Sequence, residues 1–422
     1  MKGIVPNHEG GNFIALWRDD KCCYKVGEIF VNIPALFPEG VLRAGGGGYF
    51  CRSPNAPPGM PQRTLRLITE TEDDRPVYVA GTFNDWTTAQ EAYRLRPSET
   101  SGQYEITLKL DDTPLQVEYK YTRGGWEAVE LGRYGESALN HSRYVNDDWT
   151  VPDRVENWAR AGLYFREELL PQIVIINEAF EIPELIRTRR VAALLPHDYY
   201  ETDKRYPVLY LQDGQNLYDE YAPYGSWGVD KQLASMAARG TGDIIVVAID
   251  HAEDQRISEF TPSFRNRLGR GEGRQYIRFL AETLKPYIDE KFRTLPDPAN
   301  TGIGGSSLGG LISIYAGIIY PQVYDRLMIF SPSLWVTPRI PFRVMKLTHK
   351  FRGRVYLYGG EAESKTMVPN MLRFKEELER QTNAGDVHFE VVVDPEGQHN
   401  EARWGREFPR AVEWLFFPER LT

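Results

Sequence analysis

The sequence has 422 residues, of which 41% are hydrophobic and 26% are charged, and its formal net charge is −9 at pH 7. This acidic balance argues against a nucleic-acid-binding protein, so we expect no nucleic acid among its partners. The chain exceeds the length of one ordinary domain, and we expect two domains preceded by a leader.

Residues 1–63 mix short apolar pieces with glycines 45–48 and prolines 54, 57, 58 and 61. This composition predicts a loosely structured leader that ends in a linker. Cys22, Cys23 and Cys51 form neither a disulfide framework nor a C-x-x-C metal pattern. The first residues lack the apolar core of a signal peptide, and no stretch is long and apolar enough to span a membrane, so we expect a cytoplasmic protein.

Residues 64–150 contain segments in which apolar and polar side chains alternate. Residues 104–110 and 117–121 show this period of two most clearly. Alternation of this kind is typical of half-buried antiparallel strands, and several such strands in under a hundred residues predict a small β-sandwich of immunoglobulin-like type. Residues 152–158 are expected to connect this domain to the next one.

Three segments of the sandwich resemble the starch- and glycogen-binding modules: residues 81–86 (Gly-Thr-Phe-Asn-Asp-Trp), 118–121 and 125–126. The resemblance implies that Trp86 and Trp126 stack on glucose rings and that Lys120 hydrogen-bonds sugar hydroxyls. An exposed indole offers an apolar plane to the C–H face of a sugar, which gives this implication a physical basis. The alternative is that both tryptophans belong to the core or to a contact between the domains.

Residues 160–420 alternate apolar, β-rich runs with helical stretches. The expected strands are residues 173–177, 190–195, 208–211, 244–249, a short strand before Ser307, 327–330, 354–358 and 389–393, and helices are expected over 276–287 and 370–381. Continuous apolar strands separated by helices predict a mostly parallel sheet covered on both faces. Functional sites on such sheets lie beyond the carboxyl ends of the strands.

Residues 305–309, Gly-Ser-Ser-Leu-Gly, match the G-x-S-x-G pattern. In this pattern a strand turns sharply into a helix, and the flanking glycines make room for the turn that exposes the serine hydroxyl. Ser307 is therefore the candidate nucleophile. The free N–H groups at the start of the following helix, including that of Leu308, are suited to an oxyanion.

A serine nucleophile needs a base and an orienting carboxylate later in the chain. His399 follows the last strand in a loop beside Gly397, and Glu361 and Glu363 follow the strand before it. Spacing alone does not rank these two glutamates. Asp394 is a third candidate, although a carboxylate so near His399 in the sequence suits a loop cap better. A second oxyanion donor is expected in the loop Gln212–Asn216, where Gly214 would let the backbone approach the substrate.

Together these segments resemble the esterase family that includes enterochelin, feruloyl and acetyl-xylan esterases and mycolyltransferases. The resemblance covers residues 180–418 and rests on the loop 211–216, Arg256 with residues 259–262, the Ser307 turn, residues 331–335, and His399 with Glu401 and Trp404. It implies an α/β-hydrolase fold with Ser307 as nucleophile and His399 as base. It also selects Glu363 as the acid, with Glu361 as the alternative, and places the second oxyanion amide at Gln215, close to Gly214. Arg256, Trp335 and Trp227 become candidate substrate-binding side chains.

We therefore expect a serine esterase that acts through an acyl-enzyme on a sugar ester or a siderophore-type ester. It would require no metal and no cofactor, and a glycan on the sandwich domain is a second expected partner. Two alternatives stay open: a catalytically silent carbohydrate-binding protein, and an acyltransferase with the same three residues. The sequence does not indicate an oligomeric state.

Overall fold

The computed structural model describes residues 62–69, 73–100, 102–109, 116–144, 149, 151–219, 221–222, 224–263, 265–266, 268–336, 351–383 and 385–420, together with five short strands in residues 2–49. The chain divides into two units, Met1–Gln62 and Arg63–Thr422. In the described part of the chain, no helix is both long and apolar enough to cross a membrane.

The first unit contains short strands that the sequence did not predict. β1 (Lys2–Pro6), β2 (Asn12–Arg18) and β3 (Lys21–Tyr24) form an antiparallel sheet, and β4 (Leu42–Ala44) pairs with β5 (Gly47–Tyr49). Runs this short show no clear period in the sequence. The proline-rich linker expected before residue 63 lies outside the described residues.

The second unit begins with a β-sandwich, as predicted. One sheet has the order β13-β6-β9-β8 and another the order β12-β10-β7, while β11 pairs with β14. Their bounds are β6 Gln62–Thr69, β7 Tyr78–Gly81, β8 Arg96–Pro97, β9 Gln103–Lys109, β10 Gln116–Thr122, β11 Glu130–Leu131, β12 His141–Tyr144, β13 Asp153–Val155 and β14 Asn157–Trp158. Side chains of both sheets, such as Leu67 and Tyr119, share one buried core.

The sandwich extends further along the chain than residue 150. β13 pairs with β6 in parallel, and β14 pairs with β11, so residues 153–158 continue the sheets of this domain where a connecting segment was expected. Short 3-10 helices complete the domain at η1 (Glu91–Tyr93) and η2 (Trp126–Ala128), and η3 (Glu167–Leu169) follows it.

The larger domain is built on an eight-stranded sheet with the order β15-β16-β18-β17-β21-β22-β23-β24. β15 and β16 are antiparallel to their neighbours, and the pairs from β18 to β24 are parallel, which confirms the predicted α/β-hydrolase fold. The strands are β15 Gln172–Ile182, β16 Arg187–Leu195, β17 Val208–Gln212, β18 Ile245–Ile249, β21 Thr301–Ser306, β22 Arg326–Phe330, β23 Gly353–Gly360 and β24 Val387–Asp394, with the short pair β19 Arg265–Asn266 and β20 Gly269–Arg270 outside this sheet.

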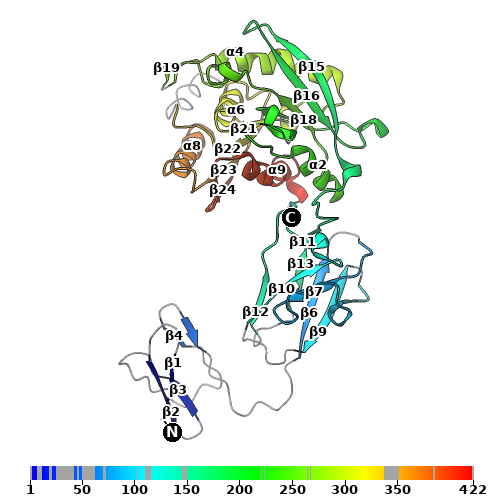
Figure 1. The fold of residues 1–422 in the computed structure, drawn as a ribbon. Coiled ribbons are helices and arrows are strands. Elements are labelled where there is room, and N and C mark those ends of the chain that lie inside the picture. Colours follow the sequence, from blue (N-terminus) through cyan, green and yellow to red (C-terminus); the bar gives the residue numbers. More distant parts are fainter. Residues whose placement is uncertain are drawn as a thin grey trace. The chain divides into compact units, whose positions relative to one another are not determined.

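Helices cover both faces of this sheet (Figure 1). One face packs against α4 (Gly273–Arg278), the π-helical segment η6 (Phe279–Leu284), α5 (Lys285–Lys291), α6 (Leu308–Ile319) and α8 (Met367–Gln381). The other face packs against α1 (Gln215–Tyr218), α2 (Val229–Ala238) and α9 (Glu401–Phe416). The remaining elements are η4 (Tyr199–Glu201), η5 (Glu253–Gln255), α3 (Arg256–Glu259), η7 (Pro298–Asn300) and η9 (Pro418–Arg420).

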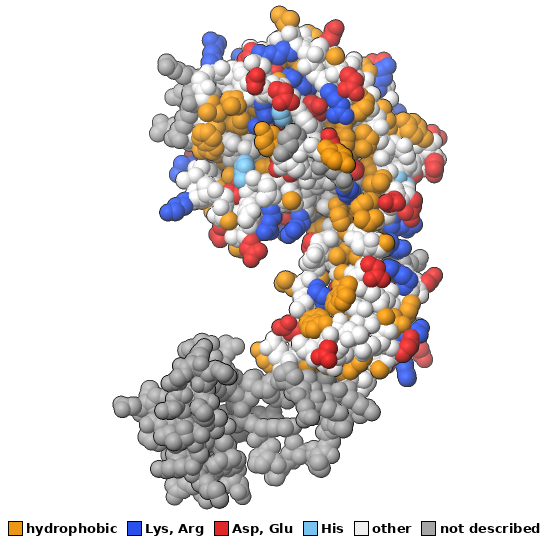
Figure 2. All heavy atoms as spheres, in the orientation of Figure 1, with side chains coloured by type: hydrophobic (Ala, Val, Ile, Leu, Met, Phe, Trp, Pro, Cys, Tyr) orange, Lys and Arg blue, Asp and Glu red, His pale blue; other side chains and the backbone are white. Residues whose placement is uncertain are grey.

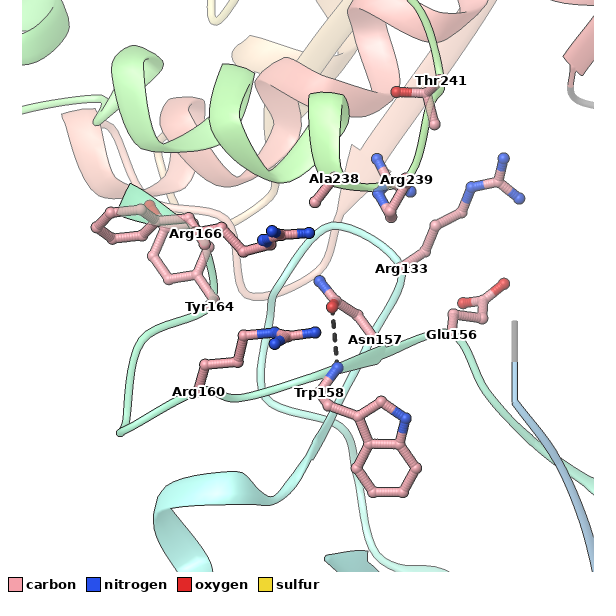
Figure 3. Close-up of a pocket in the computed structure, with 11 residues that line it drawn as sticks. Arg133, Glu156, Asn157, Trp158, Arg160, Tyr164, Arg166, Ala238, Arg239 and Thr241 are labelled. Atoms are coloured by element: carbon pink, nitrogen blue, oxygen red, sulfur yellow. Dashed lines mark hydrogen bonds between the residues drawn. The ribbon is translucent and has the colours of Figure 1, made fainter. Parts of the chain in front are cut away.

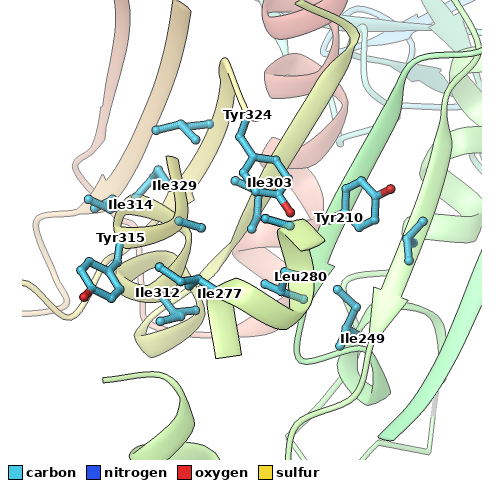
Figure 4. Packing of buried hydrophobic residues seen from close by; sticks show 14 of the residues in the cluster. Tyr210, Ile249, Ile277, Leu280, Ile303, Ile312, Ile314, Tyr315, Tyr324 and Ile329 are labelled. Carbon is cyan, nitrogen blue, oxygen red and sulfur yellow. The ribbon is translucent and has the colours of Figure 1, made fainter. Parts of the chain in front are cut away.

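Alternation along each strand divides the core into two clusters. In β17, Val208 and Tyr210 pack toward one layer of helices, whereas Leu209 and Leu211 pack toward the other. Figure 4 shows part of the first cluster, where Ile303 of the central strand β21 lies among side chains of η6 and α6. Each large aliphatic side chain buried in this way contributes roughly 1.5–3 kcal/mol to folding. This core holds β21, and therefore the turn that follows it, in a fixed position.

Candidate active site

The G-x-S-x-G segment forms a sharp turn between the buried strand β21 and the helix α6. Ser307, at the turn, has φ 55° and ψ −119°, a conformation that costs a non-glycine residue about 1–3 kcal/mol. A Cβ on Gly305 would lie 3.1 Å from the Cβ of Gln212, and one on Gly309 would lie 3.0 Å from that atom. Both glycines are therefore needed for the turn to pack against the end of β17.

The Ser307 side chain is half-buried and contacts a second serine. Its Oγ lies 3.2 Å from Oγ of Ser333, and the backbone N–H of Ser333 donates to the Ser307 carbonyl at 2.9 Å. The N–H of Ser307 donates to the carbonyl of Phe330, which ties the turn to β22. Within the described residues, no hydrogen bond joins Ser307 to His399, so the nucleophile–base contact that the chemistry requires is not formed in this structure.

His399 and Glu363, the glutamate that the family resemblance selects, lie side by side. Nδ1 of His399 is 2.6 Å from Oε2 of Glu363, whose side chain is only 2% exposed, whereas that of His399 is 42% exposed. The other carboxylate oxygen accepts hydrogen bonds from Oγ of Ser331 at 2.7 Å and from the N–H of Gly360 at 2.6 Å. Burial alone would raise the pKa of Glu363, but the hydrogen bonds from His399, Ser331 and Gly360 outweigh it and lower the pKa.

Two glycines allow the loops that carry Glu363 and His399 to meet. A Cβ on Gly360 would lie 2.1 Å from the carbonyl oxygen of Gly397, and one on Gly397 would lie 2.6 Å from Cα of Gly360. The backbones of the two loops are therefore in direct contact. Asn400 then caps α9 by accepting a hydrogen bond from the N–H of Arg403, which fixes the end of the histidine loop.

The other two carboxylates considered from the sequence have different places. Glu361 is exposed. Asp394 accepts hydrogen bonds from the Tyr358 hydroxyl at 2.8 Å and from the N–H of Glu396 at 3.0 Å, as expected for a loop cap.

Ser331 connects the acid to the protein core, a role that the sequence reasoning missed. It is fully buried with φ 43°, and its Oγ accepts from Nε1 of Trp404 at 2.9 Å while it donates to Glu363. The Trp404 ring also packs edge-on against the His399 ring, with centroids 4.9 Å apart. Ser331 and Ser333 follow β22, the neighbour of the nucleophile strand. That position was the available signal, because the carboxyl ends of parallel strands share one edge of a sheet.

The loop after β17 carries the candidate for the second oxyanion donor. Among the described residues, the backbone nitrogens of Gln215 and Leu308 donate to no acceptor, and each stands at the first position of a helix. Oε1 of Gln215 accepts from the N–H of His251 at 2.9 Å, which holds this loop in place. The prediction for Gly214 needs correction. The loop packs directly on the end of β18, and the N–H of Gly214 donates to the Ile249 carbonyl at 2.9 Å. This N–H therefore does not point to a substrate oxygen.

Arg256 braces the same loop. Its Nε and Nη2 bind the two carboxylate oxygens of Asp213 at 2.6 and 2.8 Å, and Asp213 itself has φ 59°. A bidentate pair of this kind fixes a strained loop more firmly than a single hydrogen bond. The guanidinium that the sequence suggested for substrate binding is thus engaged with Asp213.

The two candidate tryptophans of this domain differ in exposure. Trp335 is 44% exposed and follows Ser333 by two residues in the chain. Trp227 is only 4% exposed and stacks on Phe330 with centroids 5.3 Å apart. The prediction that Trp227 contacts the substrate was therefore wrong, because this side chain fills the core between α2, α9 and the sheet.

In the sandwich, Trp86 and Trp126 lie near each other. Their ring centroids are 6.3 Å apart, and Trp126 is 45% exposed. The side chain of Asn84 holds the turn before Trp86 in place. Its Oδ1 accepts a hydrogen bond from the N–H of Gly81, and its Nδ2 donates to the carbonyls of Val79 and Thr87. Trp86 itself has φ 57°. Figure 2 shows apolar side chains gathered on the visible face of this domain.

The remaining candidate on the sandwich, Lys120, is half-buried, and its Nζ donates to the carbonyl of Ala138. Its ammonium group is thus already engaged with the backbone of the sandwich.

Most of the larger domain is similar in sequence to known proteins. Residues 182–415 match a family model described as "Putative esterase". The uncharacterized protein YbbA of Bacillus subtilis is 22% identical over 246 residues, which cover 56% of this chain and 95% of that protein. The siderophore triacetylfusarinine C esterase of Aspergillus fumigatus is 27% identical over 137 residues, 31% of this chain and 44% of that enzyme.

A different relative matches the N-terminal region. An α-amylase of Niallia circulans is 40% identical over 89 residues, which make up 21% of this chain but only 7% of the amylase. The predicted resemblance was to starch- and glycogen-binding modules, and this match to a segment of a starch-degrading enzyme agrees with it.

Proposed function

This chain belongs to the esterase family whose model it matches, and on that premise we propose that it is a serine carboxylic ester hydrolase that uses Ser307, His399 and Glu363. The observation that carries the proposal is the 2.6 Å contact between Nδ1 of His399 and the buried carboxylate of Glu363. The loops that carry these two residues lie at the same edge of the sheet as the strained turn at Ser307. A neutral imidazole whose Nδ1–H is held by a carboxylate presents Nε2 as a base.

In the proposed mechanism, Ser307 Oγ forms a bond to the ester carbonyl carbon while Nε2 of His399 takes its proton. The negative charge that develops on the carbonyl oxygen would be bound by the N–H groups of Leu308 and Gln215. One such donor is worth about 3–4 kcal/mol of barrier. His399 then gives the proton to the departing alcohol, and a water molecule deprotonated by the same imidazole releases the acid from Ser307.

The substrate that we propose is a sugar ester or a siderophore-type ester. Support comes from the sequence similarity to the fungal siderophore esterase and, for sugar esters, from the amylase-like region. Hydrolysis of acetyl and feruloyl sugar esters and of siderophore trilactones should be compared at equal concentrations. If an added acceptor alcohol takes up the acyl group in preference to water, the chain is an acyltransferase with the same three residues.

The esterase proposal is tested with p-nitrophenyl acetate. We expect the wild type to hydrolyse it and Ser307→Ala to be inactive. Ser333→Ala, a matched change at the neighbouring hydroxyl, should retain most of the activity. An inactive wild type, or an active Ser307→Ala variant, would reject the assignment.

A second candidate function is glycan binding by the sandwich. The tryptophan pair with centroids 6.3 Å apart supports it, since two adjacent indoles can stack on consecutive sugar rings. Retention on amylose in affinity electrophoresis should be lost in Trp126→Ala and kept in Tyr144→Ala, an equally exposed aromatic of the same domain. A wild type that migrates unretarded would exclude starch-like ligands.

A further inference from the structure

A cavity of about 440 Å³ lies outside the catalytic site, between the sandwich and the end of α2 (Figure 3). The sandwich contributes Arg133 and Asn157 to its lining, the segment after β14 contributes Arg160 and Arg166, and the residue after α2 is Arg239. Four guanidinium groups from three separate segments thus converge on one space, and Glu156 is the single acidic side chain among the described residues that line it.

Two of these guanidinium groups, those of Arg133 and Arg239, lie beside the buried carboxylate of Glu413. Arg239 is 8% exposed, and its Nη2 lies 3.2 Å from Oε1 of the buried Glu413. Nε of Arg133 lies 3.4 Å from the other oxygen of the same carboxylate, which also accepts from the Tyr134 hydroxyl at 2.9 Å. Glu413 therefore serves two guanidinium groups, and the carboxylate of Glu156 also attracts that of Arg239. The Nε atom of Arg239 is buried without a hydrogen-bond partner, and burial lowers the pKa of this arginine.

The two arginines of the segment after β14, Arg160 and Arg166, are more exposed. Arg160 is 45% exposed, and its Nη2 is 4.0 Å from a carboxylate oxygen of Asp73, too far for a hydrogen bond. Arg166 is 42% exposed and pairs with Glu168 at 2.6 Å. Figure 3 shows the guanidinium groups of both arginines pointing into the space below α2. Surface pairs of this kind are weak and can exchange for a better partner.

We propose that this cavity binds a small organic anion that carries at least two negative charges on phosphate or carboxylate groups. Guanidinium forks bind both groups with paired hydrogen bonds, and a buried cation without a full partner gains most from such a ligand. The volume falls within the range of small-molecule sites. Tyr164 adds aromatic surface and Asn157 adds an amide, which suit an organic body larger than a bare ion. The inference is independent of the esterase chemistry, since no residue of the cavity belongs to the proposed catalytic site.

Binding is measured by calorimetry on the full chain at low ionic strength, with pyrophosphate, glucose 6-phosphate and citrate as probes and glucose as the uncharged control. We expect saturable binding of at least one anion with a stoichiometry of one, and none of glucose. Phosphate probes that bind while citrate does not would assign the ligand to phosphate esters, and the reverse would assign it to polycarboxylates. No saturable binding of any anion would overturn the proposal.

Variants test whether the anion occupies this cavity. Arg160→Gln and Arg166→Gln alter exposed side chains and should each weaken binding roughly tenfold or more, the usual effect of losing a charge-assisted hydrogen bond. Arg278→Gln removes an equally charged side chain that is 62% exposed and paired with Glu282 on the larger domain, and should leave the affinity unchanged. Equal loss in all three variants would indicate a general charge effect and contradict the assignment.

A measurement on the wild type needs no variant. Phenylglyoxal modifies accessible arginines, and mass spectrometry of peptides reports each position. The bound anion should protect Arg160 and Arg166 from modification while Arg278 reacts as before. Unchanged reaction at Arg160 and Arg166 in the presence of a saturating anion would place the ligand elsewhere and overturn the proposal.

Discussion

Replacing Glu363 by glutamine tests how the acid controls the histidine. One carboxylate oxygen accepts two hydrogen bonds, from Ser331 and from the Gly360 amide, so the oxygen of a glutamine amide would stay at that position. The NH₂ group would then face Nδ1 of His399, where the oxygen now lies at 2.6 Å. Because NH₂ only donates, the imidazole would have to accept at Nδ1 and carry its proton on Nε2.

A histidine with its proton on Nε2 cannot take one from Ser307. We therefore expect kcat of Glu363→Gln to fall by about 10⁴, equivalent to roughly 5.4 kcal/mol of barrier, with KM nearly unchanged. Steady-state hydrolysis of p-nitrophenyl acetate measures both constants. Glu361→Gln, an exposed glutamate two residues away, is the matched control and should behave as the wild type. A Glu363→Gln enzyme within about tenfold of the wild-type kcat would refute the reasoning.

Three further changes have defined outcomes. Ser331→Ala should lower the free energy of unfolding by roughly 1–3 kcal/mol in urea titrations, because buried Nε1 of Trp404 loses its acceptor. Burial raises the pKa of Glu401 in the folded state. The ionised side chain therefore destabilises the fold at pH values above the ordinary glutamate pKa. Glu401→Gln should raise the melting temperature at about pH 7 and give no gain below about pH 4. Burial alone would lower the pKa of His141, but the carboxylate of Glu130 at 2.9 Å outweighs this effect and raises the pKa. Protonated His141 therefore stabilises the folded state. The loss of stability in His141→Gln should be full below about pH 6.5 and should fade as the pH rises through the folded-state pKa of His141.

The sequence predicted the larger domain well because its signals are local. The strand before His399 contains a short apolar run, whereas the Gly-rich strand before Ser307 was inferred from the turn that follows it. Their places in the chain match β24 and β21. The Gly-flanked serine likewise indicated the turn, since only small neighbours fit there. Glu363, in contrast, was selected by the resemblance to a family. Its contact with His399 depends on the close approach of Gly360 and Gly397, which lie far apart in the chain.

Other features depend on contacts that no local pattern encodes. An exposed and a buried tryptophan look alike in a sequence, so the core position of Trp227 became visible only through its stacking on Phe330. The N–H of Gly214 donates to the Ile249 carbonyl because the end of β18 lies against this loop. The arginines around the cavity come from segments with no shared motif, and only the packing of the sandwich near Glu413 brings them together.

Covalent labelling of the nucleophile tests the central claim most directly. A fluorophosphonate should add once to the wild-type chain, and peptide mass spectrometry should locate the adduct on Ser307. The adduct should be absent from Ser307→Ala and present in Ser333→Ala, whose lost hydroxyl lies 3.2 Å away. An adduct on Ser333, or ester hydrolysis that continues with Ser307 unlabelled, would contradict the account.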